Sequence, residues 1–175
     1  MILDTHVLAN PEKIGLNIAV LSLTGQNNGA KRLDRVSKAY RTTLTYGLIM
    51  MVIGGTMIYV FARPLMAFFT EDQTVVRIGV EYLHIASITL CSYVILFQTV
   101  FLLQGLKKPM YAIFIGIYRQ IVAPVIVFYF LAYFLDWKLD GIWWGVFGVT
   151  WSAALITLFY GRYVLHRLTE ESGSN

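Results

Sequence analysis

Charged residues are scarce in this chain: Asp, Glu, Lys and Arg make up only 14% of its 175 residues. An ordinary soluble domain has about 25% charged and roughly 45–50% apolar residues. Here 57% of the residues are hydrophobic, and they gather in long runs without charge. The deficit excludes an ordinary soluble domain and indicates an integral membrane protein.

Cysteine and acidic residues are also scarce. The single cysteine, Cys91, excludes an internal disulfide and a cysteine-based metal site. No acidic residue lies between Glu81 and Asp136, so the spans there carry no carboxylate to bind a driving cation. Glu81 and His84 have the Glu-x-x-His spacing of a di-iron helix, but such a bundle needs a second copy, which the sequence lacks. We therefore expect no catalytic residue, no metal and no cofactor, and the chain is not expected to be an enzyme.

Long apolar runs are what the sequence has instead. A spanning helix needs about 20 mostly apolar residues. The sequence predicts an all-α, polytopic transmembrane helix bundle with four full spans, at about 43–62, 80–104, 110–133 and 141–164.

A shorter helix at about 14–28 comes before these spans. Its apolar part, Ile14–Leu23, covers only about half a membrane thickness. It is either the inner part of a spanning helix whose outer end is missing or an interfacial helix that lies flat on the membrane.

The net charge of +4 resides in loops, not in a nucleic-acid-binding face. Basic clusters at 31–41, 107–108 and 162–167 alternate with acid-containing clusters at 63–81 and 136–140. Cytoplasmic loops carry an excess of Lys and Arg. We therefore expect a multi-pass protein of a cell membrane, of the bacterial inner-membrane type, with loop 31–41 and the C-terminus in the cytoplasm. Trp137, Trp143 and Trp144 then lie at the outer interface.

A polar stripe runs along the helix predicted at 80–104. At 100° per residue, four side chains fall within roughly 60° of one another: His84, Ser87, Cys91 and Gln98. Such a stripe faces a water-filled cavity of the transport pathway, or it is a polar packing face between helices.

Arg119 is the only charge inside the span at 110–133. Ala112, Gly116 and Ala123 share its face, which predicts close helix contact and an Arg119 side chain directed into protein. Pro124 cannot hydrogen-bond the carbonyl of Gln120, which leaves a free polar group next to Arg119. We expect a carbonyl or another polar partner within reach of Arg119. Arg119 and Gln120 are thus candidates for a substrate pathway or gate, or for a structural anchor. A second small-residue face, formed by Gly141, Gly145, Gly148 and Ser152, predicts helix packing.

Several segments resemble the MATE family of multidrug and toxic compound extrusion transporters. Residues 15–30, GLNIAVLSLTGQNNGA, resemble a family helix that ends in a Gly-Gln-Asn-x-Gly-Ala turn, in which the glycines permit a tight turn. Residues 35–41 resemble the basic segment that follows it. FFTEDQTVV at 68–76 is similar to an external Phe-Thr-x-Asp-x-x-Val motif, and LLQGLKKP at 102–109 to a Leu-x-Gly turn.

The resemblance implies that residues 1–175 are a partial C-terminal six-helix lobe, without its first helix. It implies part of a cation-coupled secondary antiporter that exports organic or drug-like compounds against Na⁺ or H⁺. The partners are then the lipid bilayer, a missing N-terminal lobe and organic cations or amphipathic substrates, with no nucleic acid. In some members an acid stands in the lobe's fourth helix, where this chain has Tyr93, so the coupling-ion site stays unassigned.

Two alternatives remain beside the antiporter. One is a lipid-linked saccharide flippase of the same superfamily, which would line its cavity with several Arg and Lys. The other is a structural membrane subunit that does not transport.

Overall fold

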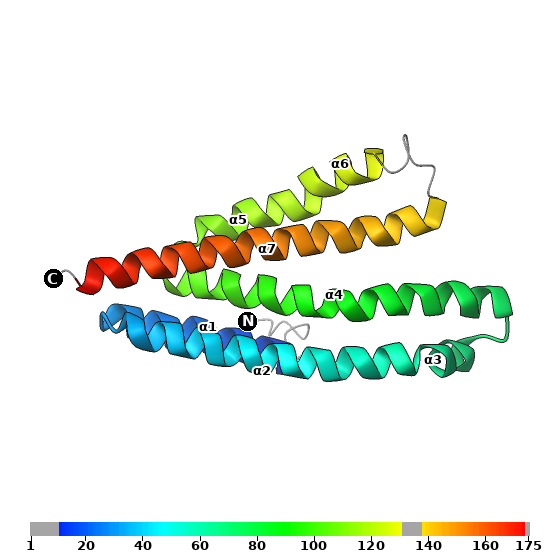
Figure 1. The fold of residues 1–175 in the computed structure, drawn as a ribbon, viewed down its shortest axis with the longest axis horizontal. Helices are drawn as coiled ribbons and strands as arrows, with labels where there is room; N and C mark the ends of the chain where they lie inside the picture. Colours follow the sequence, from blue (N-terminus) through cyan, green and yellow to red (C-terminus); the bar gives the residue numbers. More distant parts are fainter. Residues whose placement is uncertain (1–10, 131–137, 174–175) are drawn as a thin grey trace, which may run out of the picture.

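The computed structural model describes residues 11–130 and 138–173, which form a bundle whose long helices α2, α4 and α7 lie side by side along the longest axis of the molecule (Figure 1). No strand occurs in this described part, so the predicted all-α class is confirmed. The helices are α1 (Pro11–Gly29), α2 (Leu33–Val60), α3 (Ala62–Phe69), α4 (Gln73–Gly105), α5 (Met110–Ile117), the π-helical turn Tyr118–Val122, α6 (Ala123–Phe130) and α7 (Lys138–Gly173).

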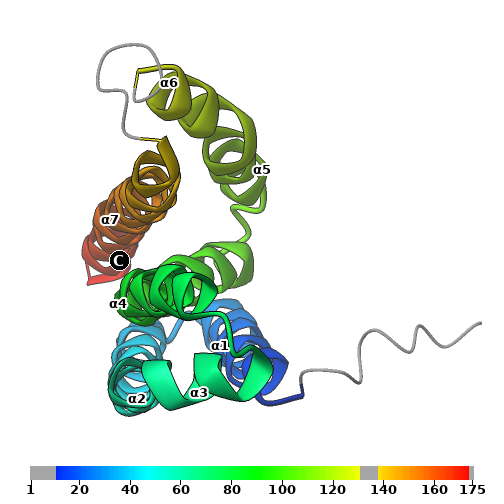
Figure 2. The ribbon, with the colours of Figure 1, turned by 90° about the vertical axis from the view of Figure 1, so that its right-hand side faces the viewer.

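Four helical segments are long and apolar enough to cross a membrane: Leu33–Val60, Gln73–Gly105, Met110–Phe130 and Gly141–Glu171. They confirm the four predicted spans. The shorter α1, with 19 residues, runs along α2 and α4 in the direction of the bundle (Figures 1 and 2). That direction is expected of the inner part of a spanning helix, and not of a helix lying flat across the ends of the others.

The helices are longer than the predicted spans. α2 begins at Leu33 and not near 43, α4 begins at Gln73 and not near 80, and α7 continues to Gly173, beyond 164. The prediction measured apolar runs, whereas Lys, Arg and Glu are good helix formers that extend a helix into water. The predicted end of the third span, residues 131–133, and Trp137 lie outside the described residues.

The turns at the ends of α1 and α4 do not depend on glycine, so that expectation was wrong. Gly25 and Gly29 lie within α1, and no described glycine has a positive φ. Lys31 and Lys107 take the left-handed conformation, with φ of 55° and 62°. After each helix the backbone makes the same pair of bonds, such as Lys107 N to Gln104 O at 3.0 Å and Lys108 N to Leu103 O at 2.9 Å. This Schellman pattern satisfies the last carbonyls of the helix.

The long helix α4 is the centre of the bundle, with α1, α2 and α3 on one side and α7 on another (Figure 2). Tyr40 and Thr99 join α2 to α4 through a buried hydrogen bond of 2.6 Å between their hydroxyl groups. The main apolar core surrounds this pair at one end of the bundle; its buried members are Val20, Leu33, Val36, Tyr40, Leu102, Leu103, Leu106, Val164 and Leu165. A second cluster, formed by Leu96, Val100, Ile115, Ala153 and Ala154, packs α4 against α5 and α7.

The basic segments gather at one end of the bundle. The turns 29–33 and 105–110 and the C-terminal end of α7 lie at the left in Figure 1, and α3 with the start of α4 lies at the right. At that second end Asp72 caps α4, because its carboxylate accepts hydrogen bonds from Thr74 N at 2.8 Å and Val75 N at 3.4 Å. The charge alternation in the sequence therefore corresponds to two ends of one bundle.

Candidate functional site

Most of the predicted polar stripe on α4 packs against α2. Gln98 is 1% exposed, and its Nε2 donates a hydrogen bond to the Thr43 carbonyl at 3.1 Å. A Cβ atom added to Gly47 would come within 2.6 Å of that Nε2. Further along the stripe, a Cβ atom on Gly55 would lie 2.9 Å from the Ser87 carbonyl oxygen. The absence of side chains at both glycines therefore allows α2 to approach α4 closely.

His84 and Cys91 lie on the same side of α4, and both are half-buried. The His84 ring stacks on the Tyr59 ring of α2, with centroids 4.0 Å apart and an angle of 23° between the planes. Ser87 Oγ donates to the His84 carbonyl at 2.7 Å within α4. The contacts of the stripe are thus those of two packed helices, and its role in a transport pathway stays a prediction.

Arg119 lies in the π-helical turn and faces α4. Its guanidinium carbon stands 5.4 Å from the centroid of the Tyr93 ring and 5.7 Å from that of Phe97. We expected a carbonyl or another polar partner for Arg119; in the described residues its contacts are these two cation–π contacts, and no carbonyl accepts a hydrogen bond from it. The side chain is half-buried, and Gln120 beside it is exposed.

The π-helical turn explains how the chain accommodates Pro124. Ala123 N donates to the carbonyl of Tyr118, five residues earlier, and this wider turn precedes the proline that cannot donate. The Tyr118 hydroxyl is 3.1 Å from Ser152 Oγ of α7, so the turn is also tied to a neighbouring helix. The polar side chains at this depth therefore include those of Tyr118 and Ser152 as well as that of Arg119.

The predicted site residues form two groups and not one. Tyr93 and Phe97 project roughly 140–180° around α4 from His84, at 100° per residue. The group around Arg119 therefore lies on the opposite side of α4 from the stripe that packs on α2.

The two small-residue faces are only partly used in packing. On the Arg119 face Ala123 is buried, but a Cβ atom on Gly116 would have nothing within 4 Å. On α7 Gly141 and Gly145 are buried, while Gly148 is exposed and equally open. The expectation of close helix contact was therefore wrong for Gly116 and Gly148 within the described residues. At the α6 end, α5 and α6 stand apart from α4 (Figure 2).

Several buried polar residues were missed from the sequence. Thr24 is fully buried in α1, and Thr99 and Thr157 are fully buried in α4 and α7. Among the described residues, three buried side-chain atoms have no hydrogen-bond partner: Thr24 Oγ1, Gln98 Oε1 and Trp151 Nε1. Threonine occurs at many helix positions, so the sequence does not show which threonines are buried. Their burial depends on which distant segments of the chain pack together.

Metal-binding chemistry finds no support in the described part of the chain, where no three side chains of His, Cys, Asp or Glu come together. Glu81 is exposed at the side of α4. The chemistry that the described residues offer is that of helix packing, the half-buried Arg119 and apolar surface. Exposed large apolar side chains cover much of the outside, among them Met50, Ile53, Phe114 and Val125.

A family model described as MatE matches residues 13–130, more than half of the chain. The chain belongs to the MATE family. No curated protein matches it.

Solved structures show the same fold. An inward-facing conformation of a multidrug resistance MATE family transporter of the MOP superfamily superposes with a TM-score of 0.84 and 20% identity, over 94% of this chain and 38% of that one. An outward-facing conformation gives a TM-score of 0.81 and 21% identity, over 90% and 35%. A MOP superfamily transporter from Pyrococcus furiosus, described as having a binding pocket of reverse polarity that suggests a different function, gives 0.81 and 21%, over 89% and 35%.

These likenesses establish the fold of a MATE transporter segment. The chain spans little more than a third of the length of the transporters that it matches. It is a multi-pass membrane protein with a transporter fold.

Proposed function

We propose that this MATE family chain forms part of a cation-coupled secondary antiporter that exports organic or drug-like compounds. The observation that carries the proposal is that one helix arrangement resembles solved transporters in both the inward-facing and the outward-facing conformation, with TM-scores of 0.84 and 0.81. Alternating access by rocking of one rigid bundle against another requires this constancy within the bundle.

The residues of this segment indicate which parts of transport it could carry out and which belong to the rest of the transporter. No acidic residue lies between Glu81 and Asp136, so a carboxylate that binds Na⁺ or H⁺ would be supplied by another part of the transporter. The half-buried Arg119 with the Tyr93 and Phe97 rings is the group here best suited to a pathway, because aromatic faces and a fixed charge can contact amphipathic compounds. We place the basic end of the bundle in the cytoplasm.

No specific observation on the described residues favours the saccharide flippase or the structural subunit over export. Both remain outcomes of the test below.

A chimera tests the proposal. Residues 11–173 would replace the matching segment of a MATE transporter, in a host without its own efflux pumps, and ethidium efflux would be followed under an imposed Na⁺ or H⁺ gradient. We expect gradient-dependent efflux from the chimera and none from the same transporter with the segment deleted. A chimera that reaches the membrane and stays inert under both gradients would contradict export as the function.

A further inference from the structure

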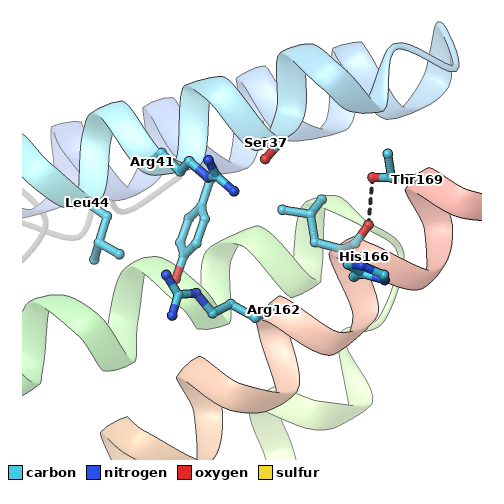
Figure 3. A pocket seen from close by; sticks show the side chains of 8 residues that line it. Ser37, Arg41, Leu44, Arg162, His166 and Thr169 are labelled. Atoms are coloured by element: carbon cyan, nitrogen blue, oxygen red, sulfur yellow. Dashed lines mark hydrogen bonds between the residues drawn. The ribbon is translucent and has the colours of Figure 1, made fainter.

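A pocket of about 420 Å³ opens between α2 and α7 at the basic end of the bundle (Figure 3). Two arginines contribute to it from different helices, Arg41 from α2 and Arg162 from α7 (Figure 3). The complete lining is Ser37, Tyr40, Arg41, Leu44, Arg162, Leu165, His166 and Thr169. None of the candidate site residues described above belongs to it.

The lining is positively charged and its arginines are not neutralised. It contains two arginines and a histidine and no acidic residue. Two carboxylates of α7 near the pocket already contact basic side chains of the same helix: Glu170 contacts His166 Nδ1 at 3.4 Å, and Glu171 contacts Arg167 Nε at 3.1 Å. Within residues 15–130 and 141–171, neither Arg41 nor Arg162 forms an ion pair. Two unpaired guanidinium groups beside one pocket favour an anionic occupant.

The position of the pocket along α2 and α7 corresponds to the depth of the lipid headgroups. Arg41 stands directly before the apolar run 42–62, and Arg162 directly follows the apolar run 141–161. Both side chains therefore lie where the hydrocarbon core meets water. Leu44 lies on the membrane side of Arg41, and Ser37 and Thr169 lie on the water side. Polarity thus changes across the pocket as it does across one leaflet of a bilayer.

Phosphate is the anion that fits this arrangement. Guanidinium groups bind phosphate oxygens through paired N–H donors, and arginine suits such planar recognition better than lysine does. Basic pockets between transmembrane helices are a known setting for anionic lipid headgroups. We propose that the pocket between α2 and α7 binds the phosphate of an anionic phospholipid through Arg41 and Arg162, with the glycerol and the start of the acyl chains against Leu44. This binding does not depend on export.

The direct test measures lipid binding to the purified chain by native mass spectrometry. Phosphatidylglycerol is titrated against phosphatidylcholine, and inorganic phosphate and glycerol 3-phosphate are added as soluble competitors. We expect a preference for phosphatidylglycerol that the double variant R41Q/R162Q weakens by about thirtyfold, as two lost arginines near a headgroup imply. Millimolar soluble phosphates should not displace the lipid.

A matched control is available at the other end of the bundle, where Arg63 and Arg77 are also exposed. The double variant R63Q/R77Q removes the same charge and should change the affinity less than twofold. R41K/R162K keeps the charge but not the paired donors, so it should bind phosphatidylglycerol more weakly than the original chain and more tightly than R41Q/R162Q. Helical content from circular dichroism shows that each variant is folded, and if R41Q/R162Q is not, R41K/R162K carries the comparison.

Three results would overturn the proposal. The first is an equal affinity for phosphatidylglycerol and phosphatidylcholine. The second is an equal loss in R41Q/R162Q and R63Q/R77Q, which would indicate net charge and not this pocket. The third is displacement of the lipid by inorganic phosphate, which would assign the pocket to a soluble phosphate compound.

Discussion

Gly105, the last residue of α4, lies directly against Thr24 of α1: a Cβ atom on Gly105 would stand 2.6 Å from the Thr24 Cβ. Asn28 Nδ2 also donates to the Gly105 carbonyl, at 3.4 Å. Thr24 and Asn28 belong to the Gly-Gln-Asn turn region and Gly105 to the Leu-x-Gly turn. Two segments that resemble separate family motifs thus form one contact at the basic end of the bundle.

Replacing Gly105 with Ala should destabilise the bundle by about 1–3 kcal/mol, the usual cost of an overpacked core. The added methyl group meets the Thr24 side chain and, at 3.1 Å, the backbone oxygen of Leu21, which cannot rotate away. Thermal unfolding in detergent measures the effect. Gly54→Ala is the control, because nothing lies within 4 Å of that position, and it should leave stability unchanged or raise it by up to about 1 kcal/mol. Equal midpoints for the two variants would contradict the tight contact.

Replacing Lys31 with Gly should stabilise the turn between α1 and α2. Lys31 has φ 55°, a conformation that costs a residue with a side chain about 1–2 kcal/mol and glycine almost nothing. Lys38→Gly removes the same charge from within helix α2 and should instead lower the free energy of unfolding by about 1 kcal/mol. Chemical denaturation of both variants should therefore shift in opposite directions. A loss of stability in both would show that the left-handed turn is not formed.

Arg119 and Tyr93 should be energetically coupled. A double-mutant cycle of Arg119→Met and Tyr93→Leu should give a coupling free energy of about 0.5–2 kcal/mol, because a cation over an aromatic face is stabilised by the ring. The cycle is needed because removal of a charge at membrane depth brings its own change in stability. A control cycle combines Arg119→Met with Tyr46→Leu. Tyr46 is an exposed residue of α2, and this cycle should give no coupling. Coupling near zero in the first cycle would refute a stabilising contact.

Cysteine labelling should place the two ends of the bundle on opposite sides of the membrane. With Cys91 replaced by Ala, single cysteines at positions 72 and 138 should react with an impermeant reagent added outside the cell. Cysteines at positions 34 and 171 should react only after permeabilisation, since they lie among the basic segments. The reverse pattern would invert the topology.

Residues 1–175 alone should not export ethidium. Alternating access requires two repeats around a midplane site, and this chain spans little more than a third of the transporters that it matches. The measurement is efflux from a drug-sensitive host under an imposed Na⁺ or H⁺ gradient, relative to an empty vector. Efflux above that reference would mean that copies of this chain assemble into a pump by themselves.

The sequence alone predicted the all-α class, the four spans and the alternation of charged ends. These properties are local: about 20 consecutive apolar residues fill the hydrocarbon core, and a helix satisfies its own backbone hydrogen bonds there. The helix ends did not follow from this local chemistry, because the apolar run marks the hydrocarbon boundary and not the last helical residue.

The tertiary structure decided which residues meet. Helical spacing grouped His84 with Gln98, but only the packed bundle showed that this side of α4 lies on α2 and that Arg119 faces the Tyr93 and Phe97 rings on the other side. Tyr40 and Thr99 are 59 residues apart, and Arg41 and Arg162 are further apart still. Such pairs depend on how whole helices pack, and packing is set by the summed fit of many side chains and not by any short stretch of sequence.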